Sequence, residues 1–108
     1  MQTILQVVCS GSKSVRDQIV NDPKLEKFNL TVEKEKKPGR SPGWAKIAST
    51  RPDARGKLNM MWDANSGILL CRVVNRGAGR PNWIIADFVD YLLAHFRRRI
   101  EAVNIIPR

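Results

Sequence analysis

The stretch 75–103 constrains the fold most, because a glycine-rich basic loop there leads directly into the longest periodic apolar segment of the chain. From Trp83 to Val103, apolar residues recur at the i, i+3, i+4 and i+7 spacing that lines one face of an α-helix. These residues are Ile85, Phe88, Val89, Leu92, Phe96, Ile100 and Val103. No other segment offers such a continuous face, so the sequence predicts one long amphipathic helix against which the core forms.

Upstream of this helix, apolar and polar residues alternate with the period of two that is typical of β-strands. Strands are predicted over 3–9, 30–35, 44–49, 57–63 and 68–74, with a hairpin turn at 64–67 in which Gly67 can take a positive φ. A short helix is predicted over 14–20, followed by a further turn over 24–28 that Asp22 can cap. Ile105 and Ile106 form either a short edge strand or a hydrophobic latch, and the sequence leaves both open.

These elements predict a single α+β domain spanning 1–108. We expect an antiparallel sheet of about five strands, with the long C-terminal helix packed across one face and a short N-terminal helix. The first strand and the short helix are expected to close one edge of the sheet. The opposite face of the sheet is then left to solvent or to a partner.

The positive charge is concentrated in the middle of the chain. The net charge is +9, and residues 39–80 hold eight Lys/Arg and two Asp/Glu, which gives +6. The corresponding values are +2 for residues 1–38 and +1 for residues 81–108. A concentrated positive field attracts polyanions. The general alternative is a solubility charge, but an even spread along the chain would be expected in that case.

Composition argues against a membrane-spanning or a disulfide-stapled protein. The uninterrupted apolar runs fall far short of the roughly 20 residues that span a bilayer. The N-terminus shows no charged segment followed by a long apolar one, so no signal peptide is expected and the predicted location is cytoplasmic. Cys9 and Cys71 are predicted to be buried free thiols on strands, since a disulfide would need an oxidising compartment. No cofactor or metal site is predicted.

The loop 75–82 is the first candidate site. Its glycines allow close approach of the backbone to a ligand, and the N–H groups at the helix start, flanked by Arg76 and Arg80, suit a phosphate. The alternative is a strand-to-helix connection that needs glycine for its geometry. The tripeptide Gly79-Arg80-Pro81 resembles the centre of an AT-hook, and Gly39-Arg40-Ser41-Pro42 resembles it more faintly.

The second candidate is a basic face of the sheet. Lys46, Lys57 and Arg72 alternate with apolar positions on three successive strands, and Trp44 and Met61 can share their side. An aromatic residue among cations is typical of platforms for single-stranded nucleic acid, although Trp44 could equally pack in the core. Loops with Arg40, Arg51, Arg55, Arg76 and Arg80 are expected to rim this face. The predicted nucleic-acid-binding residues are Arg40, Trp44, Lys46, Arg55, Lys57, Arg72, Arg76 and Arg80.

Two other functional classes stay open. Trp62, Trp83 and Ile84 could be buried in a protein-interaction surface or homodimer. Catalytic signals are poor, since no paired carboxylates, Cys–His pair or metal spacing is found, and the prediction is no enzyme. A small toxin-type RNase is the exception to consider, with Tyr91, His95, Arg76 and Arg80 as its candidates. The cluster Arg97 to Arg99 is predicted to be a solvent-exposed helix end, and it could also bind phosphate.

The order of elements over 44–103 is strand, strand, strand, glycine-basic loop and long helix. This order resembles that of two groups of proteins that bind single-stranded nucleic acid with a β-sheet and a helix, the coactivator group and the Whirly group. The resemblance extends to element order and to no motif, so it implies no residue roles. It agrees with the expected partner, a nucleic acid that is single-stranded and bound through the basic face and the loops.

Overall fold

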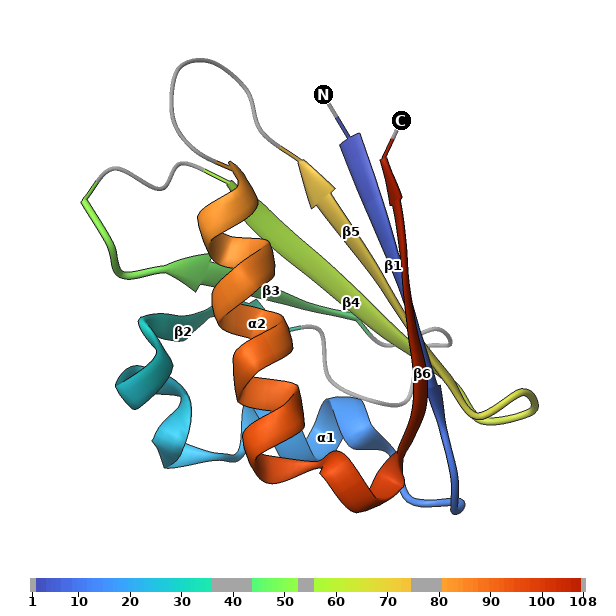
Figure 1. Ribbon diagram of the computed structural model, residues 1–108. Helices are drawn as coiled ribbons and strands as arrows, with labels where there is room; N and C mark the ends of the chain where they lie inside the picture. The colour runs from blue at the N-terminus through green and yellow to red at the C-terminus, as the bar shows by residue number, and fades with distance from the viewer. Residues whose placement is uncertain (1, 36–43, 53–55, 75–80, 108) are drawn as a thin grey trace.

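The protein is an α+β fold built on one six-stranded antiparallel sheet with strand order β2-β3-β4-β5-β1-β6 (Figure 1). This is a computed structural model that describes residues 2–35, 44–52, 56–74 and 81–107. In chain order the elements are β1 (Gln2–Cys9), α1 (Val15–Val20), the 3-10 helix η1 (Pro23–Phe28), β2 (Leu30–Glu35), β3 (Trp44–Ser49), β4 (Lys57–Asp63), β5 (Ile68–Val74), α2 (Pro81–His95), the 3-10 helix η2 (Arg97–Arg99) and β6 (Ile100–Pro107). The predicted α+β class and the five predicted strands are confirmed, and β6 is added to them.

The prediction of a helix as far as Val103 is wrong over 96–103. Helix α2 ends at His95, and the chain turns through η2 into strand β6, which pairs antiparallel with β1 over most of its length. Strand β1 therefore lies between β5 and β6 rather than at an edge, and the predicted edge role of the first strand is also wrong. Of the two readings of Ile105 and Ile106, the edge strand is confirmed, within a longer strand than expected.

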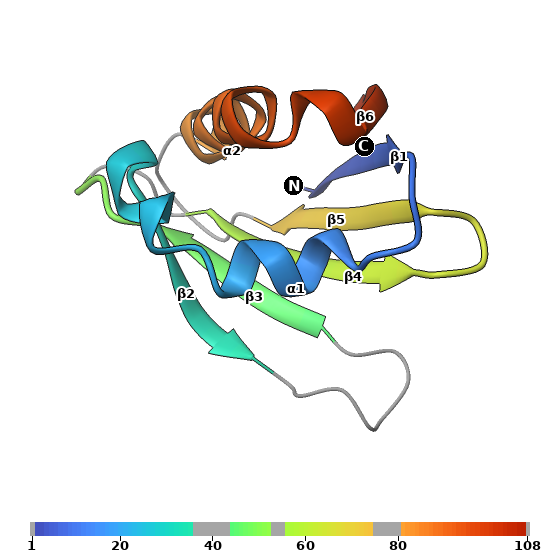
Figure 2. The same cartoon turned by 90° about the horizontal axis from the view of Figure 1, so that it is seen from below.

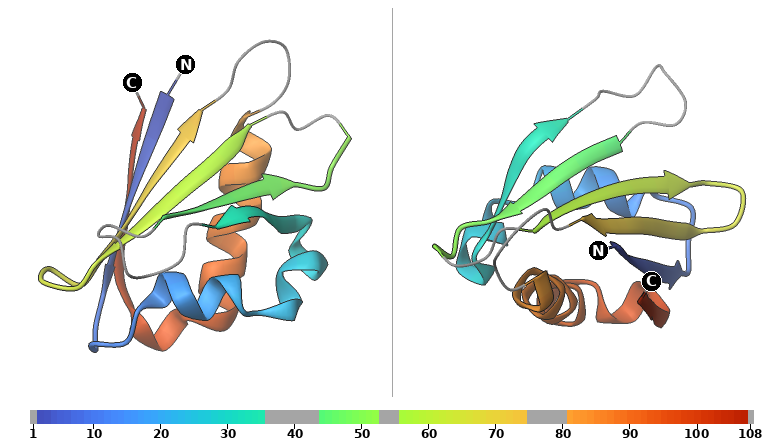
Figure 3. Two further views of the ribbon diagram at one scale, coloured as in Figure 1. Left: turned by 180° about the vertical axis from the view of Figure 1, so that it is seen from behind. Right: turned by 90° about the horizontal axis from the view of Figure 1, so that it is seen from above.

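The helices lie on one side of the sheet. Figure 1 shows α2 crossing in front of the strands, and Figure 2 shows the same helix stacked above the curved sheet. Helix α1 contacts β3 and β4 near one end of the sheet, and η1 contacts α2 and β2. Seen from behind in Figure 3, the opposite face of the sheet has no described helix packed across it.

The core fills the space between α2 and the sheet. Phe88, Tyr91 and Leu92 of α2 are fully buried against inward-facing strand residues such as Met60 and Leu69. Full burial of one such large side chain stabilises the fold by roughly 1.5–3 kcal/mol. Cys9 and Cys71 are buried and free, as predicted. The period-two alternation therefore sends one set of strand residues into this core and the other set to the opposite face.

Local hydrogen bonds fix the first two helices where the sequence placed them. The Ser14 hydroxyl accepts a hydrogen bond from the backbone N–H of Asp17 at 3.2 Å, which caps α1. The Asp22 carboxylate accepts one from the N–H of Lys24 at 3.0 Å, which caps η1. Each cap satisfies a backbone donor that would otherwise lack a helical partner. The predicted capping by Asp22 is confirmed.

The hairpin turn between β4 and β5 depends on Gly67. Its φ is +68°, its N–H donates to the carbonyl of Asp63 at 2.9 Å, and its own carbonyl accepts from the N–H of Cys9 at 2.8 Å. A Cβ atom at this position would lie 3.0 Å from the carbonyl oxygen of Cys9. The predicted positive φ is confirmed, and the site also lacks room for a side chain.

We expect Gly67→Ala to destabilise the protein by about 1–2 kcal/mol, through the unfavourable φ and the close contact with Cys9. Urea unfolding followed by circular dichroism measures the change in the free energy of unfolding. Ser66→Ala is the matched control on the same turn, and it should change stability by less than about 0.5 kcal/mol because Ser66 is exposed. Equal stability of the two variants would show that the turn tolerates a side chain.

Candidate nucleic-acid interface

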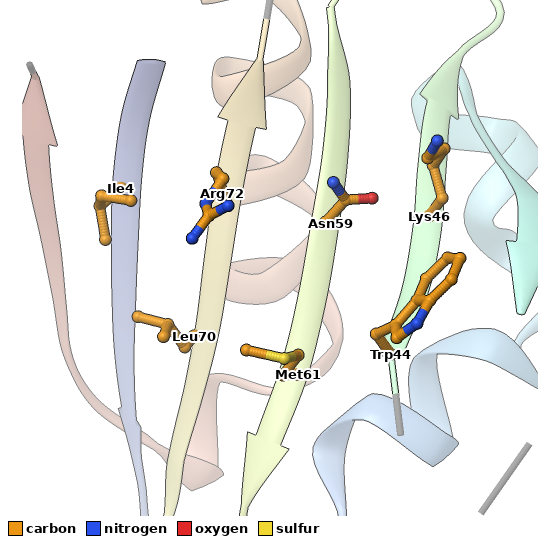
Figure 4. Close-up of a pocket in the computed structure, with 7 residues that line it drawn as sticks. All are labelled: Ile4, Trp44, Lys46, Asn59, Met61, Leu70 and Arg72. Atoms are coloured by element: carbon orange, nitrogen blue, oxygen red, sulfur yellow. The ribbon is translucent and has the colours of Figure 1, made fainter. Parts of the chain in front are cut away.

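The face of the sheet that turns away from α2 carries a depression of about 460 Å³ (Figure 4). Four adjacent strands contribute its side chains. They are Ile4 from β1, Leu70 and Arg72 from β5, Asn59 and Met61 from β4, and Trp44 and Lys46 from β3. We call the surface formed by these seven residues the open face.

The strand register arranges six of these side chains in two rows that run across the strands. Lys46 pairs with Asn59, and Asn59 pairs with Arg72, which gives a polar row. An apolar row consists of Trp44, Met61 and Leu70, which pair in the same way. Strands lie about 4.8 Å apart, so the backbone positions at the two ends of a row are roughly 10 Å apart. Residues i and i+2 of a strand separate the two rows by roughly 7 Å.

Trp44 lies on the open face and is absent from the buried core cluster, so its alternative placement in the core is not observed. Its side chain is partly exposed. Its backbone carbonyl accepts a hydrogen bond of 3.2 Å from the guanidinium of Arg16, which is only 3% exposed and also pairs with Asp17. This contact ties the start of β3 to α1 and holds the indole at one end of the apolar row.

The two cations of the polar row keep their charge available to a ligand. Within the described part of the chain, neither Lys46 nor Arg72 has a carboxylate within ion-pair distance. Arg72 is exposed and Lys46 is partly exposed. Both side chains can therefore reach an anion bound in the depression.

Lys57 lies on the same side of the sheet but is paired. Its ammonium donates a hydrogen bond to the carboxylate of Glu33 on β2. The hydrogen bond from Lys57 lowers the pKa of Glu33 from its ordinary value, and the positive charges of Lys57 and Lys46 lower it further. Of the three predicted strand cations, Lys46 and Arg72 thus have no ion pair among the described residues, and the charge of Lys57 is locally compensated by Glu33.

Arg51, expected at the rim of this face, instead contacts α2. Its guanidinium donates to both carboxylate oxygens of Asp87, at 2.7 and 3.2 Å, and lies 5.4 Å from the ring centre of Trp83. The expectation for Arg51 is therefore wrong, because an acidic helix residue captures this cation. The other rim residues, Arg40, Arg55, Arg76 and Arg80, lie outside the described residues, as does most of the candidate loop 75–82.

No protein-family model, curated protein or solved structure matches this chain. The element order that resembles the coactivator and Whirly groups holds from β3 to α2, but here the chain continues into β6. Function is therefore inferred from the open face itself.

Sequence reasoning missed Ile4, Asn59 and Leu70. Asn59 could have been found, because it lies between Lys57 and Met61 in the same alternation that placed those residues on one side of β4. Ile4 could not, because its position beside Arg72 depends on the pairing of β1 with β5. Nothing in the sequence specifies that long-range pairing.

Of the residues considered for an RNase, Tyr91 and His95 lie away from the open face, and Arg76 and Arg80 lie outside the described residues. Tyr91 is fully buried, and its hydroxyl donates to the carboxylate of Asp22 at 2.7 Å. Partial burial alone would raise the pKa of Asp22, but the hydrogen bonds from Tyr91 and the Lys24 N–H, with the nearby charge of His95, lower it. His95 is exposed, and its ring packs against those of Phe28 and Tyr91. Tyr91 therefore acts as a core residue with a satisfied hydroxyl.

The apolar residues considered for a dimer are largely used by the fold. Ile84 is fully buried, and Trp62 packs against the core with the guanidinium of Arg99 6.0 Å from its ring centre. Trp83 lies beside Arg51 and is partly exposed. These residues do not form the exposed apolar surface on which that alternative depended.

Within the described ranges, no helix has the length and apolar character to cross a membrane.

Proposed function

We propose that the open face binds single-stranded nucleic acid. The observation that carries the proposal is the parallel arrangement of two rows: a polar row whose two cations have no ion pair among the described residues, and an apolar row that ends in a partly exposed indole. A single strand presents the same two elements, a line of phosphates and a line of unpaired bases. Cations neutralise phosphates, and base stacking on an aromatic side chain is worth about 1–3 kcal/mol per base.

The dimensions of the open face suit a short segment of strand. A row of roughly 10 Å corresponds to about two to three nucleotides at the axial rise of about 3.4 Å per nucleotide of one stacked strand. Duplex ends aside, paired bases hide their faces from an aromatic side chain, so a duplex would use the cations and not Trp44. The proposal therefore includes a preference for single strands over duplexes.

The remaining loop cations fit this proposal through the points where their segments join the sheet. Segment 53–55 precedes β4 and segment 75–80 follows β5, and Lys57 pairs with Val74 in the register. Both segments thus join the sheet at the end closer to Arg72, while Trp44 marks the opposite end. We propose that Arg55, Arg76 and Arg80 extend phosphate binding beyond the polar row, and Arg40 does so beyond Trp44.

The test is the salt dependence of binding in a variant that lacks both cations of the polar row. Each phosphate contact to a single strand contributes a slope of about 0.7 in the plot of log affinity against log salt. We expect Lys46→Ala/Arg72→Ala to reduce the slope by about 1.4, which is roughly a 25-fold loss of affinity at 0.1 M salt. Fluorescence anisotropy with labelled single-stranded oligonucleotides at about 50 and 200 mM salt measures both quantities.

Lys24→Ala/Lys27→Ala is the matched control, because it removes the same formal charge from exposed residues of η1, which packs with α2 and β2. This variant should keep the wild-type slope. Equal losses in the two variants would mean that only net charge matters, and would count against the open face as the binding site. Absence of any binding by the wild-type protein would overturn the proposed function itself.

A further inference from the structure

Asn59 occupies the centre of the polar row and carries an unsatisfied acceptor. Its amide oxygen Oδ1 is buried and accepts no hydrogen bond from any described residue. Burial of an unpaired acceptor costs free energy, and most buried polar atoms of folded proteins are paired. An apolar residue of similar size would avoid this cost, so the fold alone gives no reason for an asparagine here.

The chemistry of the unsatisfied atom limits what can pair with it. An amide oxygen accepts hydrogen bonds and cannot donate them, so its partner must carry an N–H or O–H group. Ionised phosphates of a nucleic acid are acceptors only and cannot serve. A strand bound on the open face offers suitable donors in two places, the N–H groups of base edges and the ribose 2′-hydroxyl of RNA.

The position of Asn59 brings such a donor within reach. Figure 4 shows Asn59 between Lys46 and Arg72, with its oxygen directed towards β3, the strand that also carries Trp44. A base stacked on Trp44 would place its edge or its sugar between the two rows, which are roughly 7 Å apart. Because this oxygen is buried, a neighbouring side chain of the open face must move aside before a nucleoside can reach it, and Lys46 is a long and flexible neighbour.

We infer that Asn59 is a specificity-determining residue whose Oδ1 accepts a hydrogen bond from a nucleoside of the bound strand. This inference rests on the proposed function of the open face. Lys46 and Arg72 bind phosphates on either side of that nucleoside, and Trp44 stacks on its base. Binding therefore discriminates between nucleosides through one central residue, while the flanking contacts are tolerant of sequence.

The test compares Asn59→Leu with wild type on four oligonucleotides of equal length: oligo(dA), oligo(dC), oligo(dT) and oligo(rA). Oligo(rA) against oligo(dA) isolates the 2′-hydroxyl, and the three DNA strands isolate the base edge. We expect Asn59→Leu to bind the preferred strand about fivefold more weakly, the value of one neutral hydrogen bond. The variant should bind all four strands with affinities within about twofold of one another, and the salt slope should stay that of the wild type.

Gln6→Leu is the matched control, because Gln6 is a partly exposed amide paired with Leu70 on the same side of the sheet, outside the depression. This variant should keep the wild-type preference. Urea unfolding provides the second readout, and Asn59→Leu should be at least as stable as wild type because it removes an unsatisfied acceptor.

The outcomes separate the two donors and the two proposals. Loss of a preference for oligo(rA) over oligo(dA) assigns the 2′-hydroxyl, and loss of a preference among the DNA strands assigns a base edge. An unchanged preference in Asn59→Leu, or a less stable variant, would overturn the inference while leaving the proposed function standing. If the wild-type protein bound none of the four strands, both proposals would fall together.

Discussion

Replacing Arg99 with alanine is expected to destabilise the protein by about 2–3 kcal/mol, although the residue is only partly buried. Its guanidinium donates to the carbonyl of Ser10 from two nitrogens, at 3.0 and 2.8 Å, and to the carbonyl of Lys13 at 2.8 Å. A further bond of 2.9 Å reaches the side-chain oxygen of Gln18. Hydrogen bonds from a charged donor contribute more than neutral ones, and removal of the donor leaves three acceptors without this partner.

The position of Arg99 in the chain explains why this one side chain matters. It ends η2 just before β6, and it holds the loop that joins β1 to α1. In that loop Gly11 has a φ of +82°, and a Cβ atom there would meet the Arg99 guanidinium at 3.3 Å. The side chain thus connects the loop after β1 to the turn before β6, next to the pair Cys9 and Ile100.

The measurement is the free energy of unfolding in urea, with Arg98→Ala as the matched control. Arg98 is exposed, belongs to the same turn, and has no hydrogen bond or ion pair among the residues described. Its removal should change stability by less than about 0.5 kcal/mol. Arg99→Lys keeps the charge and loses the planar guanidinium, so its stability should lie between those of Arg99→Ala and Arg98→Ala. Similar values for Arg99→Ala and Arg98→Ala would show that the loop contacts add nothing to stability.

The region around Arg99 also shows why the C-terminal part of the fold was predicted incorrectly. Ile100 and Val103 continue the apolar spacing of the helix, and that period was followed through residues that belong to a strand. Ile100, Val103, Ile105 and Ile106 are β-branched, a composition that favours strands. Tertiary structure decides between helix and strand here. Strand β1 is apolar on both faces and offers a second edge, and β6 pairs with that edge. The periodicity of the local sequence does not predict the pairing of β6 with β1.

The open face was predictable to the extent that short-range rules determine register. The turn 64–67 sets Asp63 opposite Ile68, so Asn59 falls opposite Arg72 by counting along two antiparallel strands. The pairing of Lys46 with Asn59 crosses a longer connection, and the sequence alone leaves its register open. The capture of Lys57 by Glu33 and of Arg51 by Asp87 depends on partners distant in sequence. Charge counts along the chain could not reveal that these cations are paired.

Stability is expected to fall by about 4–5 kcal/mol as the pH rises to about 11, because two buried groups must stay protonated in the folded state. Burial raises the pKa of the Cys71 thiol far above its ordinary range, with a smaller contribution from the Cys9 charge. Burial also raises the pKa of Tyr91, and its hydrogen bond to Asp22 and the charge of that carboxylate raise it further. Both side chains are fully buried, so solvent does not screen these effects.

The sign of the effect follows from proton counting. In the unfolded chain the ordinary pKa is about 8.5 for a cysteine and about 10 for a tyrosine, so each side chain releases its proton near that pH. Above these values the folded protein binds more protons than the unfolded chain, so the free energy of unfolding decreases with pH. Each group contributes about 1.4 kcal/mol for every pH unit above its unfolded pKa. At about pH 11 the loss of stability is therefore about 3.4 kcal/mol from Cys71 and about 1.4 kcal/mol from Tyr91.

Tyr91 allows a direct test because it is the only tyrosine of the chain. Tyrosinate absorbance in a pH titration therefore reports this residue alone, and it should appear only together with the loss of circular dichroism as the protein unfolds. The variant Tyr91→Phe/Cys71→Ala should be less stable at neutral pH, since it loses the hydrogen bond to Asp22 and buried volume. Its free energy of unfolding should nevertheless decline far less between about pH 8 and 11 than that of the wild type.

Two results would contradict this account of the core. Ionisation of Tyr91 near pH 10 in the folded protein would mean that water reaches its hydroxyl, and the contact with Asp22 would then not survive in solution. An equally steep pH dependence in the double variant would assign the alkaline loss to other groups, of which Cys9, whose pKa is also raised by burial, is the first to test. With the first result, more water would enter the space between α2 and the sheet than close packing around Phe88 and Tyr91 allows. The separation of a dry inner face from an open outer face would then need revision.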